Sequence, residues 1–253
     1  MGTYVITGGA SGIGAAIKEQ LQANGNEVLV VDLKDADINA NLATPEGRRD
    51  AVAAIGKATT AGLAGLVCSA GVGSHVPDQA LIAGVNYFGA VELVEGLRDL
   101  LVANKAGVLL VSSNSAPMPT NPDFIEALLA GDESSAAAIA VEMESHQVYS
   151  GTKLALTRWM RRNTQAYAVE GVRMNAIAPG YTRTPLSLAV EDDPAYGDAI
   201  KQFIASIPIG RPGLPEDMAN AASFLLSDKA SFICGAMLFI DGGHDAMMRP
   251  DQF

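Results

Sequence analysis

The chain has 253 residues, of which 49% are apolar and 18% are charged, a composition typical of a folded globular protein with a substantial core. Its formal net charge of −11 argues against a nucleic-acid partner, because such proteins gain affinity from clustered Lys and Arg. No apolar run approaches the roughly 18 residues that span a bilayer, so we expect no membrane partner either.

Residues 1–14 open directly on a strand pattern and carry no secretion-signal pattern. The two cysteines, Cys68 and Cys234, stand far apart in apolar surroundings, which predicts core residues and not a disulfide or a pair of ligands. Together these features predict a cytoplasmic protein.

Short β-rich runs bounded by Gly, Asn or Asp alternate along the chain with segments of helical length. The predicted strands are residues 4–7, 28–31, 63–69, 108–112, 172–177 and 237–240, and the predicted helices are 12–23, 45–59, 81–103, 149–168 and 215–227. The apolar residues of the strands are nearly continuous, which is typical of a parallel sheet covered on both faces. The alternation predicts an α/β fold, with residues 1–253 forming a single-domain, Rossmann-type, doubly wound parallel sheet.

The first predicted strand runs into the turn 7–14, Thr-Gly-Gly-Ala-Ser-Gly-Ile-Gly, which opens the first predicted helix. Glycines here permit a sharp turn and a close approach of the backbone to a pyrophosphate, which the start of the helix attracts. The spacing of Gly8, Gly12 and Gly14 differs from Gly-x-Gly-x-x-Gly, so a purely structural turn is the alternative. Asp32, 20 positions after Gly12, supports a dinucleotide site because it would hydrogen-bond the adenosine ribose.

The residues around Asp32 also favour NAD(H) over NADP(H) as the cofactor. Its carboxylate would repel the 2′-phosphate of NADP(H), Leu33 follows where an Arg would neutralise that phosphate, and Ser11 adds no positive charge. The sequence therefore predicts NAD(H), with Lys34 the one residue that weakens the prediction.

A candidate catalytic group follows the fourth predicted strand. Ser112 and Ser113 end that strand, where a doubly wound sheet places its ligands, and Tyr149 and Lys153 stand at i and i+4 of a predicted helix. An adjacent cation would lower the pKa of the phenol from about 10, so the pair could exchange a proton with an alcohol or ketone oxygen. The pattern Tyr-x-x-x-Lys alone is common on helices. It indicates a catalytic pair here because a phosphate-binding turn precedes it in the same chain.

The motifs of this chain and their order resemble those of the short-chain dehydrogenase/reductase family over essentially the whole chain. They comprise the turn 7–14, Asp32, Ala70-Gly71, Asn86, Ser113, Tyr149 with Lys153, Pro179-Gly180 and Asp241-Gly242-Gly243. The resemblance implies an enzyme that oxidises a secondary alcohol or reduces a ketone with NAD(H).

The resemblance also implies roles for particular residues. Tyr149 would be the acid/base, Lys153 would in addition hold the nicotinamide ribose, and Ser113 would hydrogen-bond the substrate oxygen. Asn86 would support a water relay that returns the proton to solvent through Lys153. Ser112 and Ser115 are the competing hydroxyls, and we expect Ser112 to face the core.

The residues implied in cofactor binding are Gly8, Ser11, Gly12, Ile13, Gly14, Asp32, Asn41, Leu42, Ala70, Gly71, Tyr149, Lys153, Pro179, Gly180, Thr182 and Thr184. The chain departs from the family pattern in two places near these residues. Cys68-Ser69 stands before Ala70-Gly71 where many relatives carry two Asn, so a supporting amide is missing, and Asn41 stands where an Asp often meets adenine. No metal ligand set is expected.

Tyr149 lies 36 positions after Ser113, a longer spacing than the family usually has. Residues 116–146 are therefore an insertion before the helix of the catalytic Tyr, and we predict a loop followed by one or two helices outside the sheet. In most relatives that helix contributes to a four-helix dimer interface, which an insertion would obstruct. We expect a homodimer through another surface, or another homo-oligomer.

The insertion and the terminal run 241–253 resemble bacterial 3α-hydroxysteroid dehydrogenases/carbonyl reductases, as do Asn-Tyr-Phe-Gly-Ala at 86–90 and Asp-Pro-Ala-Tyr-Gly at 193–197. This branch implies a 3-hydroxysteroid, a 3-ketosteroid or another carbonyl substrate. Residues 184–206 are the predicted substrate loop. Its apolar side chains favour an apolar alcohol or ketone, unless they pack an amphipathic lid: Leu186, Leu188, Val190, Tyr196, Ile200 and Phe203.

Two alternatives stay open. One is an aryl or coniferyl-type alcohol dehydrogenase or a dihydrodiol dehydrogenase; the other, from a different class, is an inactive dinucleotide-binding sensor on the same fold. Intact Ser113, Tyr149 and Lys153 favour catalysis. The remaining expectations are loop or surface positions for His75, His146 and His244, packing roles for Trp159 and Met160, and a solvated face for Glu126, Asp132, Glu133, Glu142 and Glu144.

Overall fold

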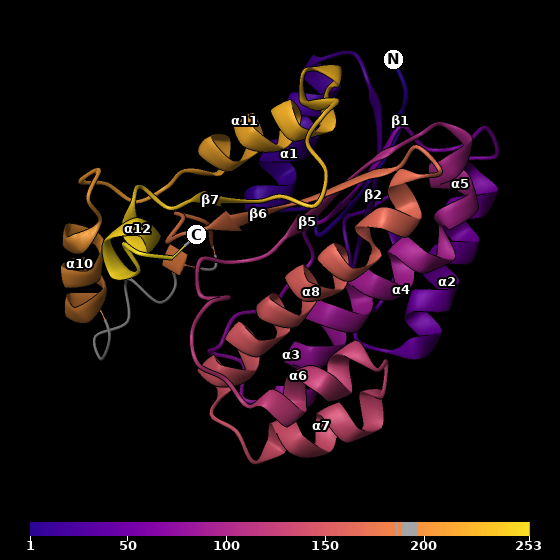
Figure 1. Ribbon diagram of the computed structural model, residues 1–253. Coiled ribbons are helices and arrows are strands. Elements are labelled where there is room, and N and C mark those ends of the chain that lie inside the picture. The colour runs from indigo at the N-terminus through magenta and orange to yellow at the C-terminus, as the bar shows by residue number, and fades with distance from the viewer. Residues whose placement is uncertain (186, 189–196, 253) are drawn as a thin grey trace.

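In the computed structural model, which describes residues 1–185, 187–188 and 197–252, a seven-stranded sheet has the order β3-β2-β1-β4-β5-β6-β7 (Figure 1). Every neighbouring pair is parallel. The strands are β1 Thr3–Thr7, β2 Glu27–Asp32, β3 Ile38–Asn39, β4 Gly65–Cys68, β5 Gly107–Val111, β6 Arg173–Pro179 and β7 Met237–Ile240. The predicted doubly wound parallel sheet is confirmed, and the short edge strand β3 was not predicted.

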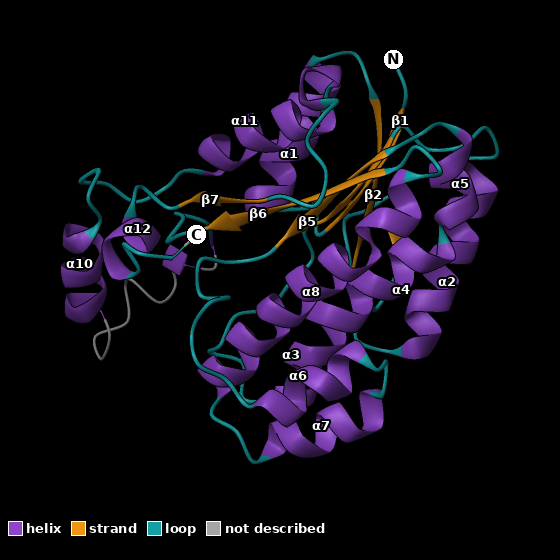
Figure 2. Cartoon of the chain, in the orientation of Figure 1, coloured by secondary structure: helices purple, strands orange, loops and turns teal. Residues whose placement is uncertain are grey.

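Helices cover both faces of the sheet (Figure 2). On one face lie α1 Gly12–Ala23 and α11 Pro215–Leu226; on the other lie α2 Pro45–Ala58, α4 Gly89–Gly96, α5 Arg98–Ala103 and α8 Ser145–Ala168. The strand side chains divide between two buried clusters, with Val5 and Leu66 in one and Ile6 and Val67 in the other. Successive strand residues point to opposite faces, so both faces need apolar side chains, as the continuous apolar runs predict.

The strand order fixes where a ligand can enter. From β1 the chain builds outward through β2 and β3, and then returns to place β4 on the other side of β1. The loops after β1 and β4 therefore diverge and leave a crevice at the carboxyl ends of the strands.

The helix predicted at 81–103 is interrupted. It consists of α3 Gln79–Ala83, a π-helical turn over Gly84–Phe88, then α4 and α5. A π-turn inserts a residue into the helical ladder and frequently marks a functional site. Two helices of the C-terminal part, α10 Gly197–Ser206 and α12 His244–Met248, were not predicted.

The insertion forms α6 Pro122–Leu129 and α7 Glu133–Val141, which lie against α3 and α8 (Figure 1). Both helices start at capping side chains, since Asn121 and Asp132 accept hydrogen bonds from backbone N–H groups of the first turn. Phe124, Ile125 and Leu128 are fully buried in the core that also contains Trp159 and Met160. The prediction of a loop followed by helices outside the sheet is confirmed.

Two expectations of residue placement were wrong. Glu133 does not belong to a solvated face, because its carboxylate pairs with the buried guanidinium of Arg48. Cys234 is exposed, whereas Cys68 is buried as predicted. No helix among the described residues is long and apolar enough to cross a membrane.

Candidate active site

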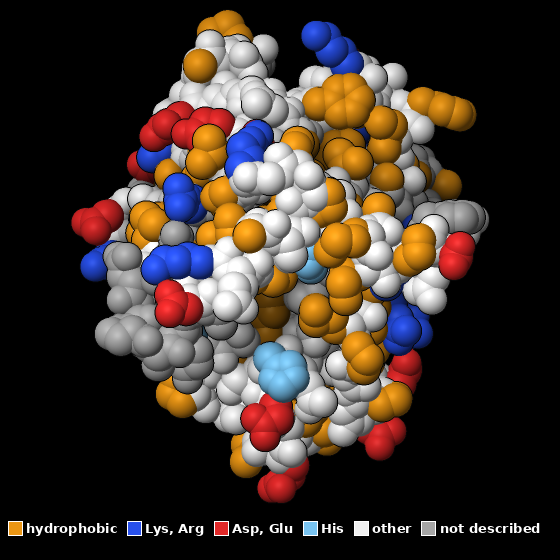
Figure 3. Space-filling model, turned by 90° about the vertical axis from the view of Figure 1, so that its left-hand side faces the viewer, with side chains coloured by type: hydrophobic (Ala, Val, Ile, Leu, Met, Phe, Trp, Pro, Cys, Tyr) orange, Lys and Arg blue, Asp and Glu red, His pale blue; other side chains and the backbone are white. Residues whose placement is uncertain are grey.

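A pocket of about 750 Å³ opens at the carboxyl ends of the strands, on the face that Figure 3 shows. Apolar side chains surround the hollow, and histidine stands beside it. Of the predicted site residues, all but Asn86 line this pocket: Gly8, Ser11, Gly12, Ile13, Gly14, Asp32, Asn41, Leu42, Ala70, Gly71, Ser113, Tyr149, Lys153, Pro179, Gly180, Thr182 and Thr184. The fold thus brings the residues predicted to bind the dinucleotide and the residues predicted to catalyse the reaction into one cavity.

The turn between β1 and α1 forms one wall and depends on glycine at two positions. Gly8 has φ +69°, and a Cβ there would lie 2.7 Å from the backbone of Ala70, while a Cβ on Gly14 would lie 2.2 Å from the carbonyl oxygen of Gly8. Helix α1 starts in the pocket with no acidic side chain in its first turn and no side-chain cap from Ser11. Its first N–H groups and its dipole therefore favour an anion in the pocket.

Asp32 ends β2 beside this turn. Its carboxylate accepts hydrogen bonds from Ala10 N (3.2 Å) and Leu33 N (2.8 Å), which hold it at the pocket wall. The next residue, Leu33, is 68% exposed and uncharged. It therefore does not neutralise the negative charge of the Asp32 carboxylate.

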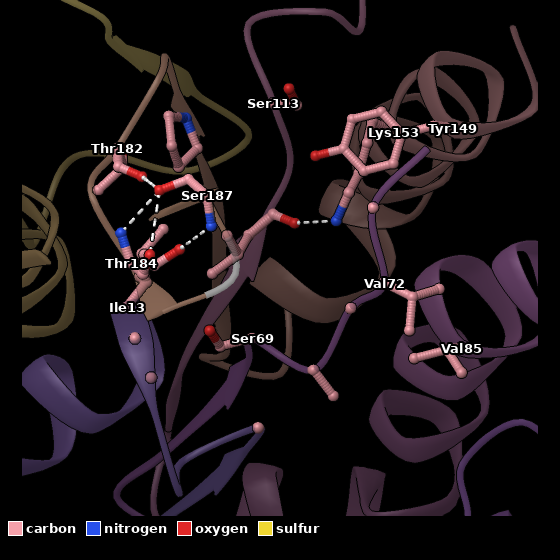
Figure 4. Close-up of a pocket in the computed structure, with 18 of the residues that line it drawn as sticks. Ile13, Ser69, Val72, Val85, Ser113, Tyr149, Lys153, Thr182, Thr184 and Ser187 are labelled. Carbon is pink, nitrogen blue, oxygen red and sulfur yellow. Dashed lines mark hydrogen bonds between the residues drawn. The ribbon is translucent and has the colours of Figure 1, made fainter. Parts of the chain in front are cut away.

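The start of the loop after β4 is held by Thr7. The Thr7 hydroxyl oxygen accepts hydrogen bonds from Ser69 N (3.2 Å) and Ala70 N (3.1 Å), so the loop is anchored to the end of β1. The side chain of Ser69 faces the pocket (Figure 4).

Ser113, Tyr149 and Lys153 meet where β5 ends against α8, and Figure 4 shows the Tyr149 hydroxyl directed toward Ser113. The Ser113 oxygen accepts from Ser115 N (3.1 Å) and from the Ser115 hydroxyl (3.0 Å). Because its oxygen already accepts these bonds, the Ser113 proton is free to be donated toward Tyr149 or a bound oxygen. Ser112 faces the core, as expected, and bonds Lys153 O (3.1 Å) and the Thr157 hydroxyl (3.1 Å).

Lys153 is 5% exposed, and its ammonium donates to Val111 O at 2.9 Å. Burial lowers the pKa of Lys153 to about 8, and burial raises the pKa of Tyr149, which a hydrogen bond with Ser113 lowers in part. The expected lowering of the phenol pKa by Lys153 is therefore not what this structure shows. The ammonium lies 5.7 Å from the centre of the Tyr149 ring and is bonded to the backbone instead of the phenol oxygen.

Asn86 lies in the π-turn behind the pocket wall and is 1% exposed. Its amide accepts from Val72 N (2.8 Å) and donates to Val72 O (3.0 Å). A Cβ on Gly71 would lie 3.2 Å from Asn86 Oδ1 and 3.6 Å from Lys153 Nζ. Asn86 therefore fixes the loop after β4 directly beside the Lys153 ammonium.

The end of β6 and the segment after it supply a further wall with Pro179, Gly180, Thr182 and Thr184. Sequence reasoning missed Ser187, whose hydroxyl donates to Thr182 O (2.9 Å) or Thr184 O (3.1 Å) and accepts from Thr184 N (2.9 Å), as Figure 4 shows. These bonds fold the segment into a closed turn. The signal in the sequence that could have indicated this turn is the pair Thr182 and Thr184 shortly before Ser187.

The substrate side of the pocket differs partly from expectation. Ile200 and Phe203 line it as the predicted loop implies, whereas Leu186, Val190 and Tyr196 lie outside the described residues. His75 and His146, expected at the surface or in loops, are exposed but also line the pocket. His146 stands one helical turn before Tyr149, a spacing that could have revealed it.

Residues 8–245 match the protein family described as enoyl-(acyl carrier protein) reductase. The chain is 41% identical to the 3-alpha-hydroxysteroid dehydrogenase/carbonyl reductase of Comamonas testosteroni, with all of both chains covered. It is 32% identical to the cis-4-hydroxycyclohexanecarboxylate dehydrogenase of Sinomonas cyclohexanicum, with 96% of each chain covered.

Among solved structures, the chain is similar to the 3-alpha-hydroxysteroid dehydrogenase from Pseudomonas sp. B-0831 complexed with NADH. The TM-score is 0.94 at 44% identity, covering 99% of this chain and 100% of that one. Sequence and fold are thus similar over the whole length.

Proposed function

The chain belongs to the short-chain dehydrogenase/reductase family, and we propose that it is an NAD(H)-dependent oxidoreductase that interconverts a secondary alcohol and a ketone. The observation that carries the proposal is the meeting of Ser113, Tyr149 and Lys153 in the pocket that also contains the turn 8–14 and Asp32. This arrangement favours an enzyme over an inactive dinucleotide sensor. A sensor would need neither the hydroxyls of Ser113 and Tyr149 nor the buried ammonium of Lys153.

The residues of the pocket fit NAD(H). The start of α1 would hold the pyrophosphate, Asp32 would bond the adenosine ribose, and Asn41 with Leu42 would flank the adenine. The turn closed by Ser187 would hold the nicotinamide through Thr182 and Thr184. The solved relative complexed with NADH supports this choice of cofactor.

Proton movement is assigned to side chains of this chain, while bound NAD(H) supplies or accepts the hydride. In ketone reduction, the Tyr149 phenol donates its proton to the substrate oxygen, and the Ser113 hydroxyl donates a hydrogen bond to the same oxygen. Both donors stabilise negative charge that develops there. In alcohol oxidation Tyr149 accepts the proton.

The Lys153 ammonium, which lines the same pocket, would bind the nicotinamide ribose of NAD(H). Asn86 supports the return of the proton to solvent. Because its amide is engaged on both sides by Val72, we assign it a positioning role for the loop beside Lys153.

We propose a bulky apolar substrate, in particular a 3α-hydroxysteroid or a 3-ketosteroid. The named activity of the relative that is 41% identical supports it, as do Ile200 and Phe203, which reach the pocket from the proposed substrate loop 184–206. We further propose a cytoplasmic homodimer or other homo-oligomer. Its subunit interface would differ from the one that the family resemblance implies for α8, because α6 of the insertion lies against α8.

Tyr149→Phe tests the mechanism. We expect loss of steroid turnover, followed by NADH absorbance, with NADH binding unchanged, because the phenol oxygen alone is removed. The matched control, Tyr4→Phe at the start of β1, should keep full activity. Full activity in Tyr149→Phe would contradict the mechanism. A faster reaction with a coniferyl-type alcohol or a dihydrodiol than with a 3α-hydroxysteroid would contradict the substrate.

A further inference from the structure

Arg48 of α2 is 1% exposed, which is unusual for a residue whose charge is normally hydrated. Its guanidinium bonds two carboxylates: Nε donates to Glu92 Oε2 (2.8 Å), and the two terminal nitrogens donate to Glu133 (3.1 and 2.5 Å). The guanidinium also lies 5.6 Å from the centre of the Phe88 ring. Such a buried cation is tolerated only with near-complete pairing.

The same guanidinium holds a wall of the dinucleotide pocket. Nη1 donates to Leu42 O (3.3 Å) and Ala43 O (3.4 Å), two consecutive carbonyls of the segment 41–43. Asn41 and Leu42 line the pocket, and Leu42 is 5% exposed.

Tight packing leaves this segment little freedom on the side away from the pocket. A Cβ on Gly47 would lie 2.1 Å from Asn41 O, one on Gly84 2.7 Å from Ala43 O, and one on Gly89 3.2 Å from Leu42 Cβ. Segment 41–43 thus rests on the backbones of α2, the π-turn and α4, and Arg48 bonds its carbonyls from the same side. A shift of the guanidinium would move the carbonyls that set the position of Leu42.

The two carboxylates that fix Arg48 come from different parts of the chain. Glu92 belongs to α4 of the sheet-covering layer, whereas Glu133 opens α7 of the insertion. Glu133 makes the bidentate contact, the geometry that best restrains a guanidinium. Removing the Glu133 carboxylate leaves Arg48 with one carboxylate partner, that of Glu92. The terminal nitrogen Nη2, which points toward α7, then loses the carboxylate oxygen to which it donates.

We propose that Arg48 is a positioning residue for the adenine end of the cofactor and that the insertion sets its position through Glu133. The chain of contacts runs from Glu133 to Arg48, to the carbonyls of residues 42 and 43, and to the wall of the pocket. The proposal rests on the proposed function insofar as the pocket binds NAD(H), and it adds a role for the insertion in cofactor affinity.

The test compares Glu133→Gln with wild type by isothermal titration calorimetry, using ADP-ribose as the adenine-end probe and nicotinamide mononucleotide as the other end. We expect the Kd for ADP-ribose to rise about three- to tenfold, with the Kd for nicotinamide mononucleotide unchanged. Arg48→Lys should act in the same direction, because an ammonium cannot reproduce the forked contact. The matched control is Glu126→Gln, an exposed insertion residue 3.8 Å from Arg162, which should leave both constants unchanged.

An unchanged Kd for ADP-ribose in both folded variants overturns the inference, even if their melting temperatures fall, because the network would then serve stability alone. An equal loss of affinity for both probes overturns it too, since the effect would not be confined to the adenine end. Should Glu133→Gln not fold, Arg48→Lys decides by the same comparison. Wild-type protein that binds no ADP-ribose overturns the inference and the proposed cofactor together, whereas loss of steroid turnover alone concerns only the proposed function.

Discussion

Replacing Lys153 by Met should make the fold more stable below pH 8 while abolishing catalysis. The side chain is 5% exposed, and burial lowers its pKa from the ordinary 10.5 to about 8. At about 1.4 kcal/mol per pKa unit, keeping the ammonium in the folded state costs about 3 kcal/mol at neutral pH. Loss of the bond to Val111 O offsets about 1–3 kcal/mol of the gain, so the net stabilisation is about 0–2 kcal/mol.

The dependence on pH gives the sharper measurement. Below pH 8 both folded and unfolded wild type carry the proton, and the cost is fully present. Between pH 8 and about 10.5 the unfolded chain retains a proton that the folded chain has lost, so wild-type stability rises with pH. We expect the free energy of unfolding of wild type minus that of Lys153→Met to increase by about 3 kcal/mol over this range.

The assay is denaturant unfolding of nucleotide-free protein at several pH values from 7 to 10.5. Taking the difference between variants removes the contribution of Tyr149, whose pKa is raised by burial in both proteins. The Cys68 thiol also contributes equally over this range: burial raises its pKa to about 12 and loss of the Lys153 charge raises that pKa further, so the thiol stays protonated in both folded proteins. Lys57→Met, at an exposed lysine of α2, is the control and should follow wild type at every pH. A difference between wild type and Lys153→Met that stays constant with pH would refute the reasoning.

Three further predictions concern the pocket. Gly14→Ala places a Cβ 2.2 Å from Gly8 O and should weaken NADH binding at least about tenfold by calorimetry, whereas Gly56→Ala, with nothing within 4 Å, should not. Asp32→Ala should lower kcat/KM for NADH by about tenfold or more and raise the NADPH-to-NADH ratio, because the ribose loses its charged acceptor; an unchanged ratio would argue against the assignment. Ser115→Ala removes the hydroxyl 3.0 Å from the Ser113 oxygen and should reduce kcat about three- to tenfold, less than Ser113→Ala in parallel steady-state assays.

The sequence predicts most of the fold and the cavity because both depend on local patterns. The Gly-rich turn, Asp32 and the strand-end serines are recognisable from a few neighbouring residues, and the parallel sheet then brings their positions to one edge. The π-turn at Gly84–Phe88 could not be predicted, since the apolar spacing over 81–103 also fits a regular helix.

Long-range pairing lies beyond such patterns. Arg48 and Glu133 are 85 positions apart, and each alone is typical of a solvated surface, which is why Glu133 was misplaced. The predicted direction of the shift in the Tyr149 pKa was also wrong. The spacing of two residues on a helix shows that they are adjacent. It shows neither how deeply Tyr149 is buried nor that a backbone carbonyl binds the ammonium of Lys153.

The cover that α6 and α7 place on α3 and α8 has a consequence for how this enzyme responds to dilution. A helix face covered by another subunit becomes exposed when the protein concentration falls below the dissociation constant, by mass action. Here Phe124, Ile125 and Leu128 are tethered to the surface they bury, so their local concentration is fixed by the chain itself. The apolar face around Trp159 therefore stays out of water at any protein concentration, without a second chain.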